Sequence, residues 1–179
     1  MSKKVGKNFR GIVRRATASD ADRLMELARQ AFYEAFSDVT APNDMAAYLN
    51  STFKKVEIEE QIKDAHSLYF IAEIDSFPAG YIYSYPTTPP DCVKAEDTIQ
   101  LVRLYLRKQY YGRFVGDVLM QTTLDQSRSR GYQFIWLSSW ELNHRANAFY
   151  KRWQFKIVGS QKFTVGSDIQ NDYILSRKI

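Results

Sequence analysis

The stretch that most constrains this chain runs from Leu101 to Tyr150, because it joins an apolar run, two glycines and a helical pattern without a break. The residues from Leu101 to Leu106 are of the kind that a covered strand uses. Gly112 and Gly116 follow, and the apolar spacing then becomes helical. A strand that feeds a glycine turn at a helix start can bind an anion, since the first helical turn has free N–H groups and partial positive charge. The alternative is that the two glycines only make a tight turn.

Length and composition favour one packed domain. The 179 residues suit a single domain over residues 1–179, and 45% of them are hydrophobic, which favours a globular core over a disordered chain. Residues 1–8 contain three lysines and no apolar run, so we expect a flexible basic tail there.

Composition also argues against several classes of function. No apolar run approaches the roughly 18–20 residues of a membrane helix, and no secretory signal is present, so we expect a cytoplasmic protein without a membrane partner. The single Cys92 excludes an internal disulfide, and with two distant histidines it gives no metal-ligand pattern. The net charge of +5 is spread along the chain, which we interpret as a solvated surface and not as a nucleic-acid interface.

The hydrophobic periodicity predicts the order strand, three helices, three strands, helix, strand, helix and two strands. We expect strands at residues 9–15, 67–73, 81–85, 98–107, 134–139, 155–163 and 172–176. We expect helices after residue 20, from residue 42, over 56–65, over 115–130 and over 143–152. This order gives an α/β (α+β) layered sheet with helices over its faces.

Two segments, RLYLRKQYYGRFVGDVLM and NHRANAFYKRWQF, resemble the coenzyme-binding core of the GNAT superfamily of N-acetyltransferases. The segments FYEAF, APNDMAAYL and FTVGSDIQNDYILSRKI resemble the bacterial PaiA-type branch, which acetylates polyamines and similar amines. The resemblance implies a GNAT-like fold with a mixed, mostly antiparallel sheet of about seven strands. Its fourth and fifth strands splay apart to admit acetyl-CoA as co-substrate, with no metal. It also implies a small-molecule primary amine as acceptor, and a homodimer is possible within this family.

The resemblance assigns the coenzyme to the fourth strand, the glycine loop and the helix after Asn143. Backbone N–H groups of the fourth strand would contact the acetyl carbonyl and the pantetheine arm. The candidate coenzyme-binding residues are Leu104, Tyr105, Leu106, Tyr111, Gly112, Arg113, Phe114, Val115, Gly116, Asn143, Ala146 and Phe149. For Asn143 a role as helix cap is compatible with a coenzyme contact, and Arg113 is equally well a surface arginine.

Tyr150 is the best candidate for a catalytic side chain. It matches the tyrosine that many members of the family use as a general acid toward the coenzyme A sulfur, and its ordinary pKa leaves it protonated at neutral pH. The alternative is a core aromatic residue. Glu141 is a candidate general base, because Gln100 stands where PaiA-like sequences often have a glutamate; a plain surface carboxylate is the competing interpretation.

The acceptor pocket is expected under the first two helices. Phe32, Phe36 and Tyr48 are the candidates to line it, and an aromatic stripe in the core is the alternative.

The glycine loop departs from the family pattern. Tyr111 replaces the usual Gln or Arg, Phe114 stands at a position normally held by glycine, and Asp117 adds a negative charge in the first helical turn. These three changes keep a second hypothesis open, in which the chain has a GNAT-like fold, binds coenzyme poorly and acts as a ligand sensor or interaction module.

Overall fold

The computed structural model describes residues 9–165 and 168–179, and within them it contains a sheet of seven strands in the order β1-β2-β3-β4-β5-β7-β6. The strands are β1 (Ile12–Arg15), β2 (Leu68–Ile74), β3 (Phe77–Tyr85), β4 (Thr98–Leu106), β5 (Phe134–Trp140), β6 (Lys156–Val165) and β7 (Asp168–Lys178). All neighbouring pairs are antiparallel except β4 and β5, which are parallel. The predicted fold class, a mixed and mostly antiparallel sheet, is confirmed.

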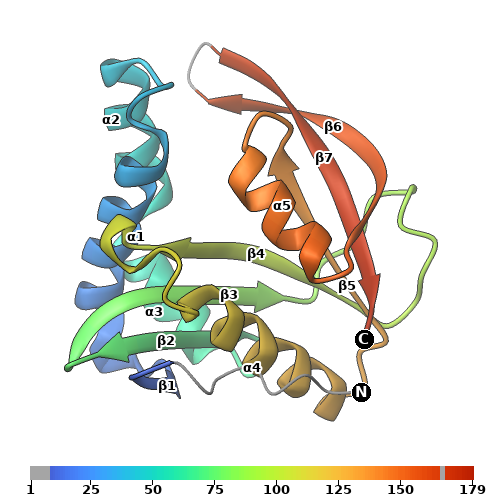
Figure 1. The fold of residues 1–179 in the computed structure, drawn as a ribbon, viewed down its shortest axis with the longest axis horizontal. Helices are drawn as coiled ribbons and strands as arrows, with labels where there is room; N and C mark the ends of the chain where they lie inside the picture. Colours follow the sequence, from blue (N-terminus) through green and yellow to red (C-terminus); the bar gives the residue numbers. More distant parts are fainter. Residues whose placement is uncertain (1–8, 166–167) are drawn as a thin grey trace.

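Helices cover both faces of this sheet (Figure 1). The α-helices are α1 (Ala21–Phe36), α2 (Pro42–Thr52), α3 (Lys55–Lys63), α4 (Val115–Ser129) and α5 (His144–Arg152), with short 3₁₀ turns η1 (Ala18–Asp20) and η2 (Lys108–Tyr110). The helices α1 and α3 pack on one face of β2 and β3, and α4 packs on the opposite face. No described helix has the length and apolar content to cross a membrane.

Side-chain alternation along the central strands divides the core in two. Leu68 and Phe70 of β2 face α4, whereas Tyr69 and Ile71 face α1. Because both faces are buried, β2 and β3 are apolar on both sides, as their sequences indicate.

The element boundaries differ from the prediction at three strands. β3 begins at Phe77 and not at Tyr81, because the turn before it needs only Asp75 and Ser76, both with positive φ. β7 spans residues 168–178, since it pairs with β5 along one edge and with β6 along the other. β1 begins at residue 12 and not at residue 9. The predicted tail at residues 1–8 and most of the turn expected at residues 166–168 lie outside the described residues.

β4 and β5 stay together for only three residues of each strand. Thr98–Gln100 pairs with Phe134–Trp136, and beyond that point the two strands diverge. The remainder of β4, from Leu101 to Leu106, still pairs with β3. The other edge of β4 therefore faces an opening in the sheet. This opening is the splay of the fourth and fifth strands that the sequence resemblance implies.

Candidate active site

A cavity of about 880 Å³ lies at the splay between β4 and β5. One part of its wall, called the loop side below, consists of residues 110–112, 114–117, Leu104, Leu106 and α5. The other part, called the aromatic side, is formed by Phe32, Phe36, Tyr48, Arg103 and Tyr105 together with residues of β5, β6 and β7. The two sides are continuous, so a ligand on one side can reach a ligand on the other.

The loop between β4 and α4 turns through two residues with positive φ. Gly112 has φ +75°, and a Cβ there would meet nothing within 4 Å. Phe114, the residue before α4, has φ 63° and ψ 6°, and its side chain makes no capping hydrogen bond. The N–H groups of the first turn of α4 therefore have no acceptor from a cap, and they start at the cavity wall. This backbone can hold a phosphate group.

Gly116 allows α4 to approach its neighbours closely. A Cβ at this position would lie 3.2 Å from the ring of Phe149 on α5 and 3.4 Å from the side chain of Leu106 on β4. The start of α4, the end of β4 and α5 thus converge on one point of the loop side.

The charged side chains of the loop side have partners. The guanidinium of Arg145 lies 3.4 Å from the ring centroid of Tyr111, so a cation from α5 stands over the loop. Asp117 accepts hydrogen bonds from Arg152 Nη2 at 2.7 Å and from Trp153 Nε1 at 3.0 Å. The negative charge that the sequence places beside the expected phosphates is therefore offset by an arginine.

The free edge of β4 presents backbone donors to the cavity. The N–H of Arg107 donates to the carbonyl of Ala79 on β3. Since N–H groups alternate between the two edges of a strand, those of Leu104 and Leu106 face the edge that β5 has left. Both residues line the cavity.

α5 places Tyr150 at the cavity wall. The helix is capped as predicted, because the side-chain oxygen of Asn143 accepts from the N–H of Ala146. The Tyr150 ring packs edge-on against Phe149 at 5.5 Å and Phe155 at 5.6 Å, and only 8% of the residue is exposed. This burial raises the pKa of Tyr150 well above its ordinary value. The hydroxyl therefore keeps its proton at neutral and moderately alkaline pH and can donate it.

Aromatic rings from four elements form the aromatic side. Phe32 of α1 stacks on Tyr48 of α2 at 4.6 Å and meets Tyr105 of β4 edge-on at 5.6 Å. Phe36 of α1 lies 6.5 Å from Tyr105 and 6.5 Å from Trp140 of β5. Phe32, Phe36 and Tyr48 are core residues that also line the cavity, so the two interpretations of the aromatic stripe coincide. Tyr105 joins them, and its ring does not lie on the loop side.

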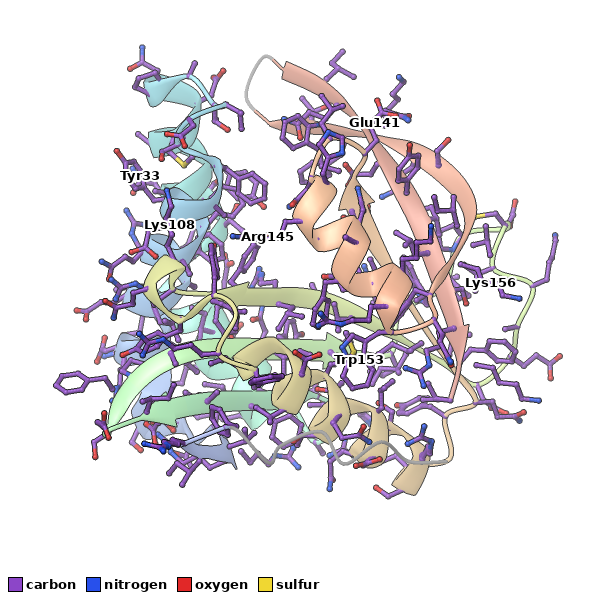
Figure 2. All side chains as sticks on the ribbon, viewed as in Figure 1. Tyr33, Lys108, Glu141, Arg145, Trp153 and Lys156 are labelled. Atoms are coloured by element: carbon purple, nitrogen blue, oxygen red, sulfur yellow. The ribbon has the colours of Figure 1, made fainter. Side chains whose placement is uncertain are left out.

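Two predicted site residues lie outside the cavity wall as described. The guanidinium of Arg113 is 5.9 Å from the ring of Tyr110, and Arg113 does not line the cavity. Glu141 follows the end of β5 (Figure 2). Its carboxylate accepts from the Asn171 side chain at 3.0 Å, and it does not line the cavity. A hydrogen bond between the Glu141 N–H and the Asn171 carbonyl holds this residue toward β7. The structure thus gives Glu141 no contact with the site that a general base needs.

Several cavity residues carry no signal in the sequence. In the sequence, Arg145 has the pattern of a surface residue and Arg103 that of a residue within a strand. Ser138 and Asp172 are polar positions within two of the last strands. The register that pairs Trp140 with Asp172 brings the side chains of Ser138 and Asp172 together. None of the described residues forms a cluster of three or more His, Cys, Asp or Glu suited to a metal ion.

The model of the acetyltransferase (GNAT) family matches residues 21–155, which is most of the chain. The chain therefore belongs to the GNAT family and is an N-acetyltransferase, of the class that takes its acetyl group from acetyl-CoA.

Relatives and solved structures agree with this assignment. An uncharacterized N-acetyltransferase of Mycobacterium tuberculosis is 27% identical over 162 residues, covering 90% of this chain and 99% of the relative. Another, from the pepI 3′ region of Lactobacillus delbrueckii subsp. lactis, is 24% identical over 160 residues, covering 89% and 92%. The crystal structure of the PaiA N-acetyltransferase from Thermoplasma acidophilum in complex with coenzyme A has a TM-score of 0.79 at 20% identity, covering 94% of this chain and 99% of that one. That likeness shows a shared fold and does not assign the chain to the PaiA-type branch.

Proposed function

We propose that this chain transfers the acetyl group of acetyl-CoA directly to a primary amine of a small molecule, polyamine-like or other, with the coenzyme on the loop side and the amine on the aromatic side. The observation that carries the proposal is the single cavity that joins an open helix start, a buried tyrosine and an aromatic pocket. Each of these parts suits one of the three groups that must meet in acetyl transfer.

The loop side fits a coenzyme that carries a pyrophosphate. The N–H groups of the loop from Gly112 to Gly116 would hold the phosphates, and Arg145 adds a cation that neither Tyr111 nor Arg113 supplies to the cavity. The edge of β4 would bind the pantetheine amides through Leu104 and Leu106. Val115, Ala146 and Phe149 provide apolar surface beside them. When bound, the coenzyme supplies an activated acetyl group as a thioester.

The chain's own groups can then assist attack by the amine. The N–H groups at the β4 edge donate to the carbonyl oxygen as it gains negative charge. The amine attacks after its ammonium form has lost a proton to water; the new C–N bond replaces the C–S bond, and the nitrogen loses a second proton to water. The Tyr150 hydroxyl, kept protonated by its raised pKa, donates its proton to the departing sulfur and regains one from water. Cys92 packs against Gly159 and does not line the cavity, so transfer without an acetyl-cysteine fits the site.

One observation favours the second hypothesis, a ligand sensor with impaired coenzyme binding. Phe114 has a left-handed backbone conformation, which is costly for a residue with a large side chain, and its side chain lines the cavity. Against this, Arg145 and Arg152 restore to the loop side the positive charge that Tyr111 and Asp117 remove.

The experiment combines calorimetry with coenzyme A and a thiol-release assay on acetyl-CoA with monoamines, diamines, polyamines and amino acids. We expect micromolar coenzyme binding and release of coenzyme A that at least one amine accelerates over the amine-free rate. Binding without acceleration by any amine would contradict both the proposed acceptor class and the sensor with impaired coenzyme binding, whereas absence of binding would favour that sensor and remove the proposed function.

A further inference from the structure

The charges around the cavity divide into paired and unpaired groups. Among the described residues that line it, Arg152 and Asp117 on the loop side form an ion pair, and Arg145 lies against the ring of Tyr111. The aromatic side carries one cation, Arg103, and one anion, Asp172, and neither belongs to an ion pair between described residues. A buried charge without a partner is unfavourable for folding, so the buried Asp172 calls for a functional explanation, and the half-buried Arg103 is the cation to consider with it.

Asp172 lies on β7, in register with Trp140 of β5 and Gln161 of β6. Only 7% of it is exposed. Its Oδ2 accepts from the Ser138 hydroxyl at 2.5 Å, and Ser138 in turn accepts from Gln161 Nε2 at 3.2 Å. Its Oδ1 is buried and has no hydrogen-bond partner. One oxygen is thus fixed in place, and the other is left without a donor in the wall of the cavity.

Arg103 lies on β4, across the cavity from β7. Its Nη1 donates to the side chain of Gln61, a neutral acceptor, at 3.2 Å. Its guanidinium lies 5.2 Å from the ring of Phe53 and 5.9 Å from that of Tyr83. A guanidinium has five N–H donors in a planar fork that matches a carboxylate. Arg103 is therefore a cation on aromatic walls, without a carboxylate of the described chain.

The two charges act on the same two tyrosines. Burial raises the pKa of Tyr48 and of Tyr105, and in both cases the charge of Arg103 lowers the pKa while that of Asp172 raises it. Tyr48 and Tyr105 both line the aromatic side. Two charges of opposite sign therefore act on the same part of one cavity.

We propose that the acceptor is a small zwitterion of the amino acid class, whose ammonium group binds Asp172 and whose carboxylate binds Arg103. This inference rests on the proposed function and narrows its acceptor. The ammonium group is the opposite charge to Asp172, and the carboxylate is the opposite charge to Arg103. Both contacts would be charge-assisted hydrogen bonds. A diamine or polyamine would pair with Asp172 but place its second cation in the field of Arg103, so the pair selects against it.

The test uses amino acids of increasing length, from glycine to 6-aminohexanoate, with the alkylamine of matching length and 1,4-diaminobutane as comparisons. Thiol release gives kcat/KM for each probe, and calorimetry gives the coenzyme A affinity of each variant. The parent should prefer at least one amino acid over its matched amine by about tenfold or more, which corresponds to about 1.4 kcal/mol. The length that is preferred reports the spacing between the two charges.

The variants separate the two contacts. Arg103→Gln should reduce the preference for amino acid over amine to about twofold or less, and Asp172→Asn should lower kcat/KM for every amine by tenfold or more. Neither should change coenzyme A affinity more than about twofold. Arg128→Gln and Asp125→Asn remove the same groups from an exposed ion pair on α4 and should behave as the parent.

The inference is overturned if the parent prefers the diamine or the plain amine, if Arg103→Gln keeps the preference, or if no amino acid is acetylated. Coenzyme A binding and acetylation of another amine in those cases would leave the proposed function standing. Loss of both coenzyme binding and acetylation of every amine would remove the proposed function itself.

Discussion

The loop side and the aromatic side of the cavity are built in opposite ways. The loop side comes from one stretch of chain and α5 and uses backbone N–H groups. Its carboxylate, Asp117, is paired with Arg152, and Arg145 lies over the ring of Tyr111. The aromatic side gathers side chains from α1, α2, β4, β5, β6 and β7 and leaves two charges without partners. A ligand common to a family can be held by backbone alone, whereas the choice of acceptor needs side chains whose charges the protein does not satisfy itself.

Removing the Tyr150 hydroxyl tests whether the two sides meet at this residue. Tyr150→Phe keeps the ring contacts with Phe149 and Phe155, so fold and coenzyme A affinity should be unchanged. Loss of the proton donor should lower kcat by about 10²–10⁴-fold. Tyr33→Phe, on the exposed part of α1, is the matched control and should have the parent's rate. A Tyr150→Phe enzyme with parental kcat would assign the proton to another group.

Filling the space at Gly116 tests the loop side alone. The methyl groups of Gly116→Val would overlap Phe149 and Leu106, so the start of α4 must move away from the cavity. We expect coenzyme A affinity to fall by about 10- to 100-fold and stability by about 1–3 kcal/mol. Gly116→Ala, whose added Cβ needs a shift of only a few tenths of an ångström, should lose much less. Equal affinities of all three proteins by calorimetry would show that this close approach does not position the loop.

The sequence predicts the loop side far better than the aromatic side. A phosphate-binding turn shows in a contiguous pattern of strand, glycines and helix start, and Gly112, Gly116, Asn143 and Tyr150 all line the cavity or cap its helix as expected. The aromatic side depends on strand register, which no local pattern of β5 or β7 reveals. Glu141, which the sequence predicts at the site, therefore lies outside the cavity wall, and Asp172 lines the cavity without a signal in the sequence.

Phe114→Gly should change two separate quantities, the free energy of unfolding and the affinity for coenzyme A. The backbone of Phe114 has φ 63°, a conformation that glycine adopts without strain, so Phe114→Gly should relieve strain in the folded protein. Relief of about 1–3 kcal/mol, reduced by up to about 1 kcal/mol of unfolded-state entropy, should raise the free energy of unfolding by roughly 0–2 kcal/mol. Coenzyme A affinity should rise about tenfold at most, through removal of the ring from the cavity wall. Thermal denaturation and calorimetry measure the two effects, and a lower Tm would contradict the strain.

We expect the smallest change in stability and in coenzyme A affinity from a substitution at Asp117, the carboxylate of the loop side that is paired with Arg152. Asp117→Asn removes an ion pair with an exposed Arg152 and a favourable charge in the first turn of α4. Stability should fall by at most about 1 kcal/mol, and Tm by about 2–4 °C. Coenzyme A affinity should rise less than about threefold and lose this gain in high salt, because Arg152 already offsets the charge. Asp125→Asn, later on the same helix, provides the comparison for an exposed pair.

The central claim is that the aromatic side keeps a charge without a partner, and Asp172→Asn tests it through stability. Burial raises the pKa of Asp172, and the hydrogen bond from Ser138 lowers it by less. A carboxyl group whose pKa is raised on folding stabilises the fold fully below its unfolded pKa of about 4, and this contribution is lost as the pH rises through the folded pKa. The neutral amide should therefore stabilise the protein at neutral pH and lose this advantage in acid.

The measurement is the Tm of Asp172→Asn relative to the parent across about pH 3.5 to 8. We predict an increase of about 2–6 °C at pH 7, shrinking toward zero near pH 4, while Asp117→Asn shows a decrease at pH 7. A lower Tm of Asp172→Asn at pH 7 would mean that the carboxylate is paired within the protein. In that case the difference between the two sides of the cavity would not exist.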